Sequence, residues 1–128
     1  MNKIPKRKCT KEIESQRHYL LILSDANFQE EVLNSVQTVL VVFGTGRHGA
    51  FHILTPILEQ LSIEYHRKVK IGLLDIDKNK FTTQKYGILR IPTLLFFEDG
   101  EIVDHIVGLV RKSTIVLKIE ESPAKRYL

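Results

Sequence analysis

Cysteine is nearly absent from this chain, since Cys9 is its one sulfhydryl in 128 residues. A single cysteine cannot form an intramolecular disulfide, which excludes the disulfide-rich secreted scaffolds. Long apolar runs are also missing: stretches such as Val39 to Phe43 are far too short to span a bilayer. No apolar run precedes His18, which argues against a secretory signal. We therefore expect a soluble, cytoplasmic protein without a membrane partner.

Basic residues crowd the N-terminus of a chain whose net charge is +4. The first eleven residues contain Lys3, Lys6, Arg7, Lys8 and Lys11. A basic arm can bind nucleic acid, but a solvated arm explains the same composition, so we do not expect a nucleic-acid partner. A chain of this length suits one domain with one core. We predict a basic, flexible arm over residues 1–16, one domain over 17–121 and a tail over 122–128.

Apolar periodicity and turn residues predict alternating strands and helices. The expected strands are 19–23, 39–43, 69–76, 93–97 and 102–107, and the expected helices follow Ser24 to about 34, then 50–66 and 78–86. Asp99-Gly100 between two apolar runs indicates a hairpin. Residues 112–121 suit a strand by β-branching and a helix by the spacing of Ile115 and Ile119. Early alternation followed by a hairpin predicts an α/β mixed sheet covered by helices.

Separate motifs over about residues 18–120 resemble the thioredoxin family in order and spacing. They are Leu23–Phe28, Val39–Phe43, Pro56–Leu61, Leu74–Asn79, Lys85–Ile88 and Ile91–Thr93, with Gly108 where that family has a glycine beside its substrate groove. The resemblance implies the thioredoxin fold, a central mixed parallel/antiparallel sheet flanked by helices on both faces. It also implies that the peptide bond before Pro92 is cis.

The same resemblance places the family's two catalytic cysteines on His48 and Phe51. The family's buried acid and its lysine neighbour become Val42 and Leu73. Disulfide exchange needs one thiolate to attack and a second thiol to resolve the mixed disulfide. These replacements lead us to expect no catalytic residue, no enzyme activity and no cofactor.

We therefore expect a redox-inactive adaptor or chaperone-like module that binds a protein partner in the former substrate groove. The identity of the partner and the oligomeric state stay open. The expected groove residues are Arg47, His48, Gly49, Ala50, Phe51, Ile91, Pro92, Thr93 and Gly108.

Three alternatives stay open at the level of the sequence. Cys9 lies among basic residues that favour its thiolate, which would allow a thiol–disulfide redox protein. His48 and His52 are four apart and can hold a metal if a third ligand exists, although two surface histidines explain the pair as well. The Gly44-x-Gly46-x-x-Gly49 loop between a strand and a helix matches a short glycine pattern for anion or nucleotide binding.

Overall fold

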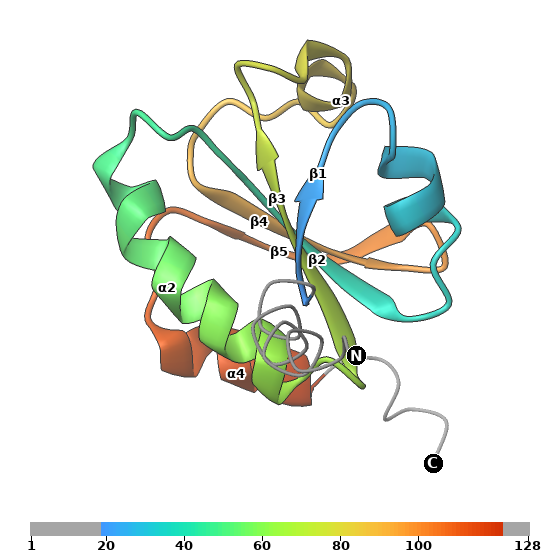
Figure 1. The fold of residues 1–128 in the computed structure, drawn as a ribbon, viewed down its shortest axis with the longest axis vertical. Helices are drawn as coiled ribbons and strands as arrows, with labels where there is room; N and C mark the ends of the chain where they lie inside the picture. The colour runs from blue at the N-terminus through green and yellow to red at the C-terminus, as the bar shows by residue number, and fades with distance from the viewer. Residues whose placement is uncertain (1–18, 122–128) are drawn as a thin grey trace, which may run out of the picture.

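A five-stranded mixed sheet forms the centre of the computed structural model, which describes residues 19–121 (Figure 1). The strands are β1 (Leu20–Leu23), β2 (Thr38–Gly44), β3 (Val69–Asp75), β4 (Thr93–Glu98) and β5 (Glu101–Val107). Their order in the sheet is β1-β3-β2-β4-β5. The expected arm over residues 1–16, including Cys9, and the expected tail over residues 122–128 lie outside the described residues.

The central strand β2 is buried along its whole length. It pairs in parallel with β3, where Val42 lies opposite Leu73, and antiparallel with β4, where Val42 lies opposite Leu94. A strand covered on both faces needs a continuous apolar sequence rather than an alternating one. This explains the run from Val39 to Phe43 and confirms the mixed sheet expected from the sequence.

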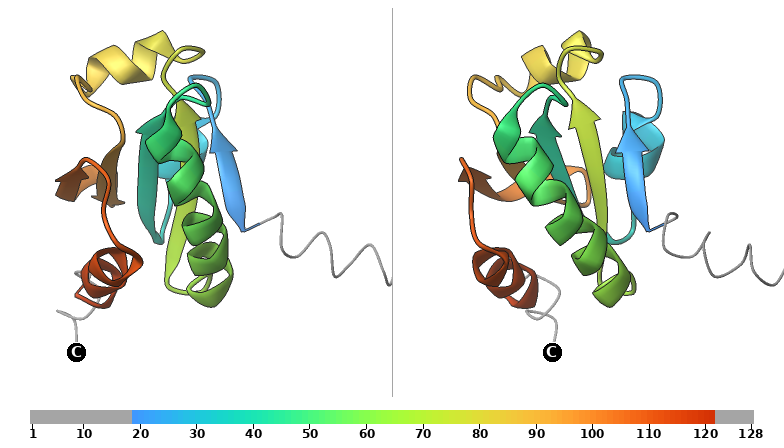
Figure 2. Two further views of the ribbon diagram at one scale, coloured as in Figure 1. Left: turned by 90° about the vertical axis from the view of Figure 1, so that its left-hand side faces the viewer. Right: turned by 60° about the vertical axis from the view of Figure 1, so that its left-hand side comes forward.

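Helices cover both faces of the sheet. They are η1 (Gln29–Leu33), a five-residue π-helix, and the α-helices α2 (Gly49–Glu64), α3 (Lys80–Lys85) and α4 (Lys112–Glu120). Figures 1 and 2 show α2 and α4 side by side on one face and η1 on the opposite face, with α3 over the end of the sheet to which β3 points. Within residues 19–121, no helix is long and apolar enough to cross a membrane.

The open assignment of residues 112–121 resolves as a helix. Ile115 and Ile119 are 0% and 1% exposed and pack with α2 and the sheet in one core cluster. Their spacing of four residues places both side chains on one face of α4. Burial of that face therefore outweighs the strand preference of β-branched residues.

The helix expected after Ser24 and Asp25 begins later than the sequence suggested. Asp25 does not cap it: its carboxylate accepts hydrogen bonds from the backbone N–H of Thr82 at 2.9 Å and from the Thr82 hydroxyl at 2.6 Å. These bonds satisfy the start of α3, where Asn79 gives no side-chain cap. The Thr82 hydroxyl bond is the largest cause that lowers the pKa of Asp25. Asp25 thus joins the turn after β1 to a helix more than fifty residues away.

Candidate functional site

The expected groove residues lie at one end of the sheet, the end to which β2 points. At this end β2 and β5 stop and β4 begins, with Phe43 opposite Thr93 and Thr93 opposite Val107. The chain leaves β2 through residues 45–48 and enters α2 directly. The strand register therefore brings the start of α2 and the segment before β4 to the same end of the molecule.

His48 forms the N-cap of α2. Its Nδ1 accepts a hydrogen bond from the Ala50 N–H at 3.3 Å, and its own N–H donates to the Thr45 carbonyl at 3.0 Å. A side-chain acceptor at this position satisfies one of the backbone N–H groups that have no partner within the first turn of a helix. His48 and Phe51 stand at the two positions matched to cysteines, so the start of α2 supplies no thiol.

Packing against Phe51 explains the glycine that opens the Gly44–Gly49 loop. A Cβ placed on Gly44 would lie 2.3 Å from Cδ1 of the Phe51 ring, closer than real atoms approach. A Cβ on Gly46 or Gly49 would have no neighbour within 4 Å. Of the three glycines in this loop pattern, Gly44 is therefore the one that must lack a side chain, because it makes room for the Phe51 ring. This packing accounts for part of the nucleotide-like pattern without any phosphate.

A carboxylate that the sequence analysis missed holds the loop before α2. Oδ2 of Asp77 accepts hydrogen bonds from Arg47 Nη2 at 2.8 Å, from Arg47 Nε at 3.1 Å and from the buried Thr45 hydroxyl at 2.9 Å. The Arg47 hydrogen bond is the largest cause that lowers the pKa of Asp77. The signal in the sequence was an acid just beyond the end of a buried strand, close to where the loop after β2 must lie.

The two candidate metal ligands, His48 and His52, are already engaged with the backbone. His48 caps α2, and the His52 ring nitrogen Nε2 bonds to the Gly46 carbonyl oxygen. Among residues 19–121 no three histidine, cysteine, aspartate or glutamate side chains gather where a metal ion could be held. Both imidazoles therefore have structural roles in shaping the loop and the first turn of α2.

The other half of the expected groove is the segment before β4. The peptide bond between Ile91 and Pro92 is cis, and Pro92 is buried while Ile91 is half-buried. The Pro92 carbonyl accepts a hydrogen bond from the Gly108 N–H at 2.8 Å, and the Thr93 hydroxyl donates to the Arg90 carbonyl at 2.6 Å. The structure thus joins Pro92 to Gly108. No hydrogen bond or ion pair joins this segment to the start of α2 within the described part of the chain.

The core beneath the loop is apolar where the resembling family has charged groups. Val42 and Leu73 lie opposite each other on β2 and β3, and their side chains are 0% and 9% exposed. A buried carboxylate at Val42 would need a partner to offset its desolvation. Val42 and Leu73 replace the acid and the lysine together, because a valine next to a leucine needs no charged partner.

The strand order, the helix that begins at the end of β2 and the cis-proline segment define an α/β protein of the thioredoxin class. Residues 19–121 match the family model described as Thioredoxin. The chain belongs to the thioredoxin family.

Relatives in this family share about two fifths of their residues with the chain. A protein named Thioredoxin from Synechocystis sp. is 40% identical over 99 residues, which cover 77% of this chain and 92% of the relative. Another of that name from Buchnera aphidicola is 41% identical over 103 residues, covering 80% and 95%. The Thioredoxin M-type, chloroplastic, of Pisum sativum is 38% identical over 100 residues, covering 78% and 58%.

These comparisons correct two expectations drawn from the sequence. The redox-inactive adaptor and the absence of enzyme activity both rested on the residues at positions 48 and 51, together with Val42 and Leu73 in the core. Relatives that match along nine tenths of their length carry the name Thioredoxin, and this points to a thiol–disulfide redox protein. These four replacements were too narrow a basis for removing the whole activity, because the chain retains one sulfhydryl, Cys9.

Proposed function

We propose that this chain is a thiol–disulfide redox protein of the thioredoxin family. The observation that carries the proposal is the match of residues 19–121 to that family together with relatives named Thioredoxin. Cys9 is the one sulfhydryl of the chain, so the proposal assigns it the role of nucleophile. His48 and Phe51 cannot form a disulfide, and the second thiol must come from outside the chain.

The exchange balances with a low-molecular-weight thiol as the reductant. The Cys9 thiolate attacks one sulfur of a substrate disulfide, which forms a mixed disulfide and releases one substrate thiolate. A first external thiolate attacks the Cys9 sulfur, which releases the second substrate thiolate and leaves the external thiol bonded to Cys9. A second external thiolate attacks the sulfur of that bound external thiol, releasing the Cys9 thiolate and forming the external disulfide. Two external thiols supply the two electrons, and the substrate leaves as two thiols.

In this proposal the end of the sheet to which β2 points holds the substrate segment near the nucleophile. The binding residues are those expected from the sequence: Arg47, His48, Gly49, Ala50 and Phe51 from the loop and α2, with Ile91, Pro92, Thr93 and Gly108 from the other half. No hydrogen bond involves the Ile91 backbone among the described residues, so its N–H and carbonyl are free to pair with an extended peptide. We also propose a cytoplasmic location, because that compartment keeps a single thiol reduced.

Reduction of insulin disulfides by a low-molecular-weight thiol tests the proposal. Addition of the full chain should accelerate the reaction, and Cys9→Ser should return the rate to that of the thiol alone. Ile91→Asp should slow the reaction with Cys9 still present, because a charge in the groove disfavours an apolar segment. The matched surface change Leu89→Asp, at a side chain 94% exposed, should leave the rate unchanged. If the wild-type chain does not accelerate the reaction, the proposal is wrong.

A further inference from the structure

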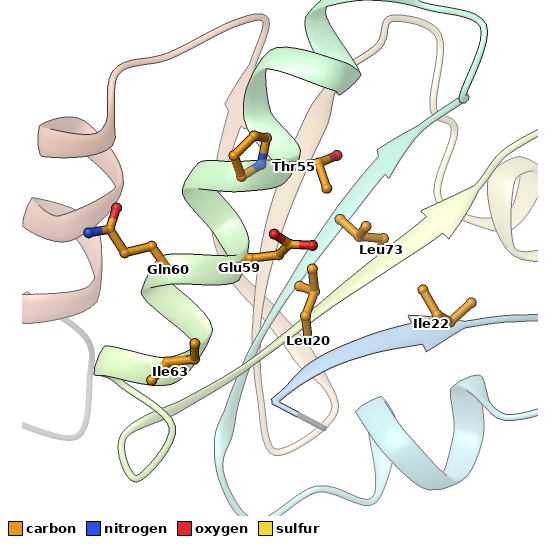
Figure 3. Close-up of a pocket in the computed structure, with 8 residues that line it drawn as sticks. Leu20, Ile22, Thr55, Glu59, Gln60, Ile63 and Leu73 are labelled. Carbon is orange, nitrogen blue, oxygen red and sulfur yellow. The ribbon is translucent and has the colours of Figure 1, made fainter. Parts of the chain in front are cut away.

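An apolar groove lies between α2 and the edge strand β1, away from the proposed substrate groove. It encloses about 790 Å³, and Figure 3 shows its walls. The lining residues are Leu20, Ile22, Thr55, Pro56, Glu59, Gln60, Ile63 and Leu73. Ile22 and Ile63 are 72% and 39% exposed, which leaves large apolar side chains in contact with water. β1 is also an edge strand of the sheet formed by residues 19–121, where β3 is its one neighbour.

One charged residue stands on the wall of this groove. Among the described residues that line it, Glu59 is the only one with an ionisable side chain, and Figure 3 shows this side chain extending from α2 toward Leu20 and Leu73. Five carboxylates elsewhere in the described residues form ion pairs with Lys or Arg, but Glu59 forms none there. An occupant that matches the groove must therefore combine apolar side chains with a basic one.

The chain itself carries such a segment immediately before the groove. Residues 1–18 end one residue before Tyr19 and two before Leu20, which lines the groove. They contain six Lys or Arg against two Glu, whereas residues 19–121 contain eleven Lys or Arg against thirteen Asp or Glu. Eighteen residues reach as far as roughly 60 Å when extended, and the sixteen-residue α2 is about 24 Å long. Residues 1–18 are thus long enough to lie along the groove, and their net positive charge is opposite to the net negative charge of residues 19–121.

We propose that residues 1–18 dock in the groove between α2 and β1. Ile4 and Ile13 supply the apolar side chains, and the neighbouring Lys and Arg residues supply the partner for Glu59. Because Cys9 lies in the middle of this segment, docking holds this sulfhydryl beside α2 and away from the proposed substrate groove. Cys9 then meets a substrate disulfide once the segment is released, and the balance between the two positions depends on ionic strength. The docking itself does not depend on the redox function.

A spin label on Cys9 gives a direct test, since the full chain has no other cysteine to label. Paramagnetic broadening of backbone amide signals then reports which residues lie near the label, with the reduced nitroxide as reference. In low salt we expect signals from Thr55 to Ile63 to be lost selectively. In 1 M salt, where the Debye length is about 3 Å, these signals should return.

A matched pair of variants separates the groove from general charge effects. Glu59→Lys should restore the α2 signals in low salt, whereas Glu30→Lys should not, because Glu30 is exposed on η1 at the opposite face. Uniform weak broadening, or equal effects of the two variants, would overturn the proposal. Broadening that grows with protein concentration would assign the groove to a second copy and would also overturn it. The spin-label experiment does not depend on disulfide turnover, so its outcome and the outcome of the insulin assay are independent.

Discussion

Gly44→Ala tests how the loop before α2 is built. The added methyl group would lie 2.3 Å and 2.7 Å from Cδ1 and Cε1 of the Phe51 ring. To relieve this clash, either the Phe51 ring must leave its place at the start of α2, or strand β2 must shift. Overpacking of this kind costs about 1–3 kcal/mol. Gly46→Ala is the matched control, because its new methyl group meets nothing within 4 Å. Its effect should stay within about 0.5 kcal/mol.

Urea unfolding of the single and double variants measures these free energies. In a Phe51→Ala background the ring atoms are gone, so Gly44→Ala should cost less than about 0.5 kcal/mol. The difference between the two backgrounds is the coupling energy of the pair. If Gly44→Ala costs the same with and without the ring, or if Gly46→Ala costs as much, then contact with Phe51 is not the reason for the glycine.

Two further predictions concern distant elements that the same structure ties together. Ile119→Ala should lower the free energy of unfolding by about 2–5 kcal/mol because it leaves a cavity under α4. Leu117→Ala, at a side chain 57% exposed, should have a small effect. Equal losses of unfolding free energy in urea would contradict the burial of the Ile119 face of α4. Asp25 has its pKa lowered by the Thr82 hydroxyl bond, so its charge adds stability above its unfolded pKa of about 3.9, and this stability is lost as the pH falls through the lower folded value. Asp25→Asn should therefore flatten the acid limb of a plot of unfolding free energy against pH, and an unchanged limb would contradict the assignment.

Much of the fold could be predicted because the strongest signals were local. The buried run in β2 and the hairpin turn at Asp99-Gly100 need few distant partners to be read from the sequence. Both turn residues have positive φ in the structure, as a two-residue hairpin turn requires. The segment over residues 112–121 was ambiguous because β-branched composition and helical spacing disagree, and only the packing of Ile119 against α2 and the sheet decides between them.

The site was harder to predict because its contacts join residues far apart in the chain. The acid in the turn after β1 has the chemistry of a helix cap, but Asp25 caps α3 and not the next helix along the chain. Likewise, Arg47 is separated by thirty residues from Asp77. The position of Asp77 after a buried strand places it near the loop, but local patterns do not say which side chain it pairs with. The replacement of the family's cysteines by His48 and Phe51 was visible, yet it led to a wrong conclusion about function. Position alone does not say whether another thiol serves.

Trapping the mixed disulfide tests the central claim most directly. The reduced full chain is mixed with a peptide that contains one disulfide, the reaction is stopped with acid, and intact masses are measured over time. The account predicts a covalent chain–peptide adduct on Cys9 that an external thiol resolves, at a rate well above that of a free small-molecule thiol. Failure to form the adduct faster than that thiol, or disulfide turnover that persists in Cys9→Ser, would contradict it.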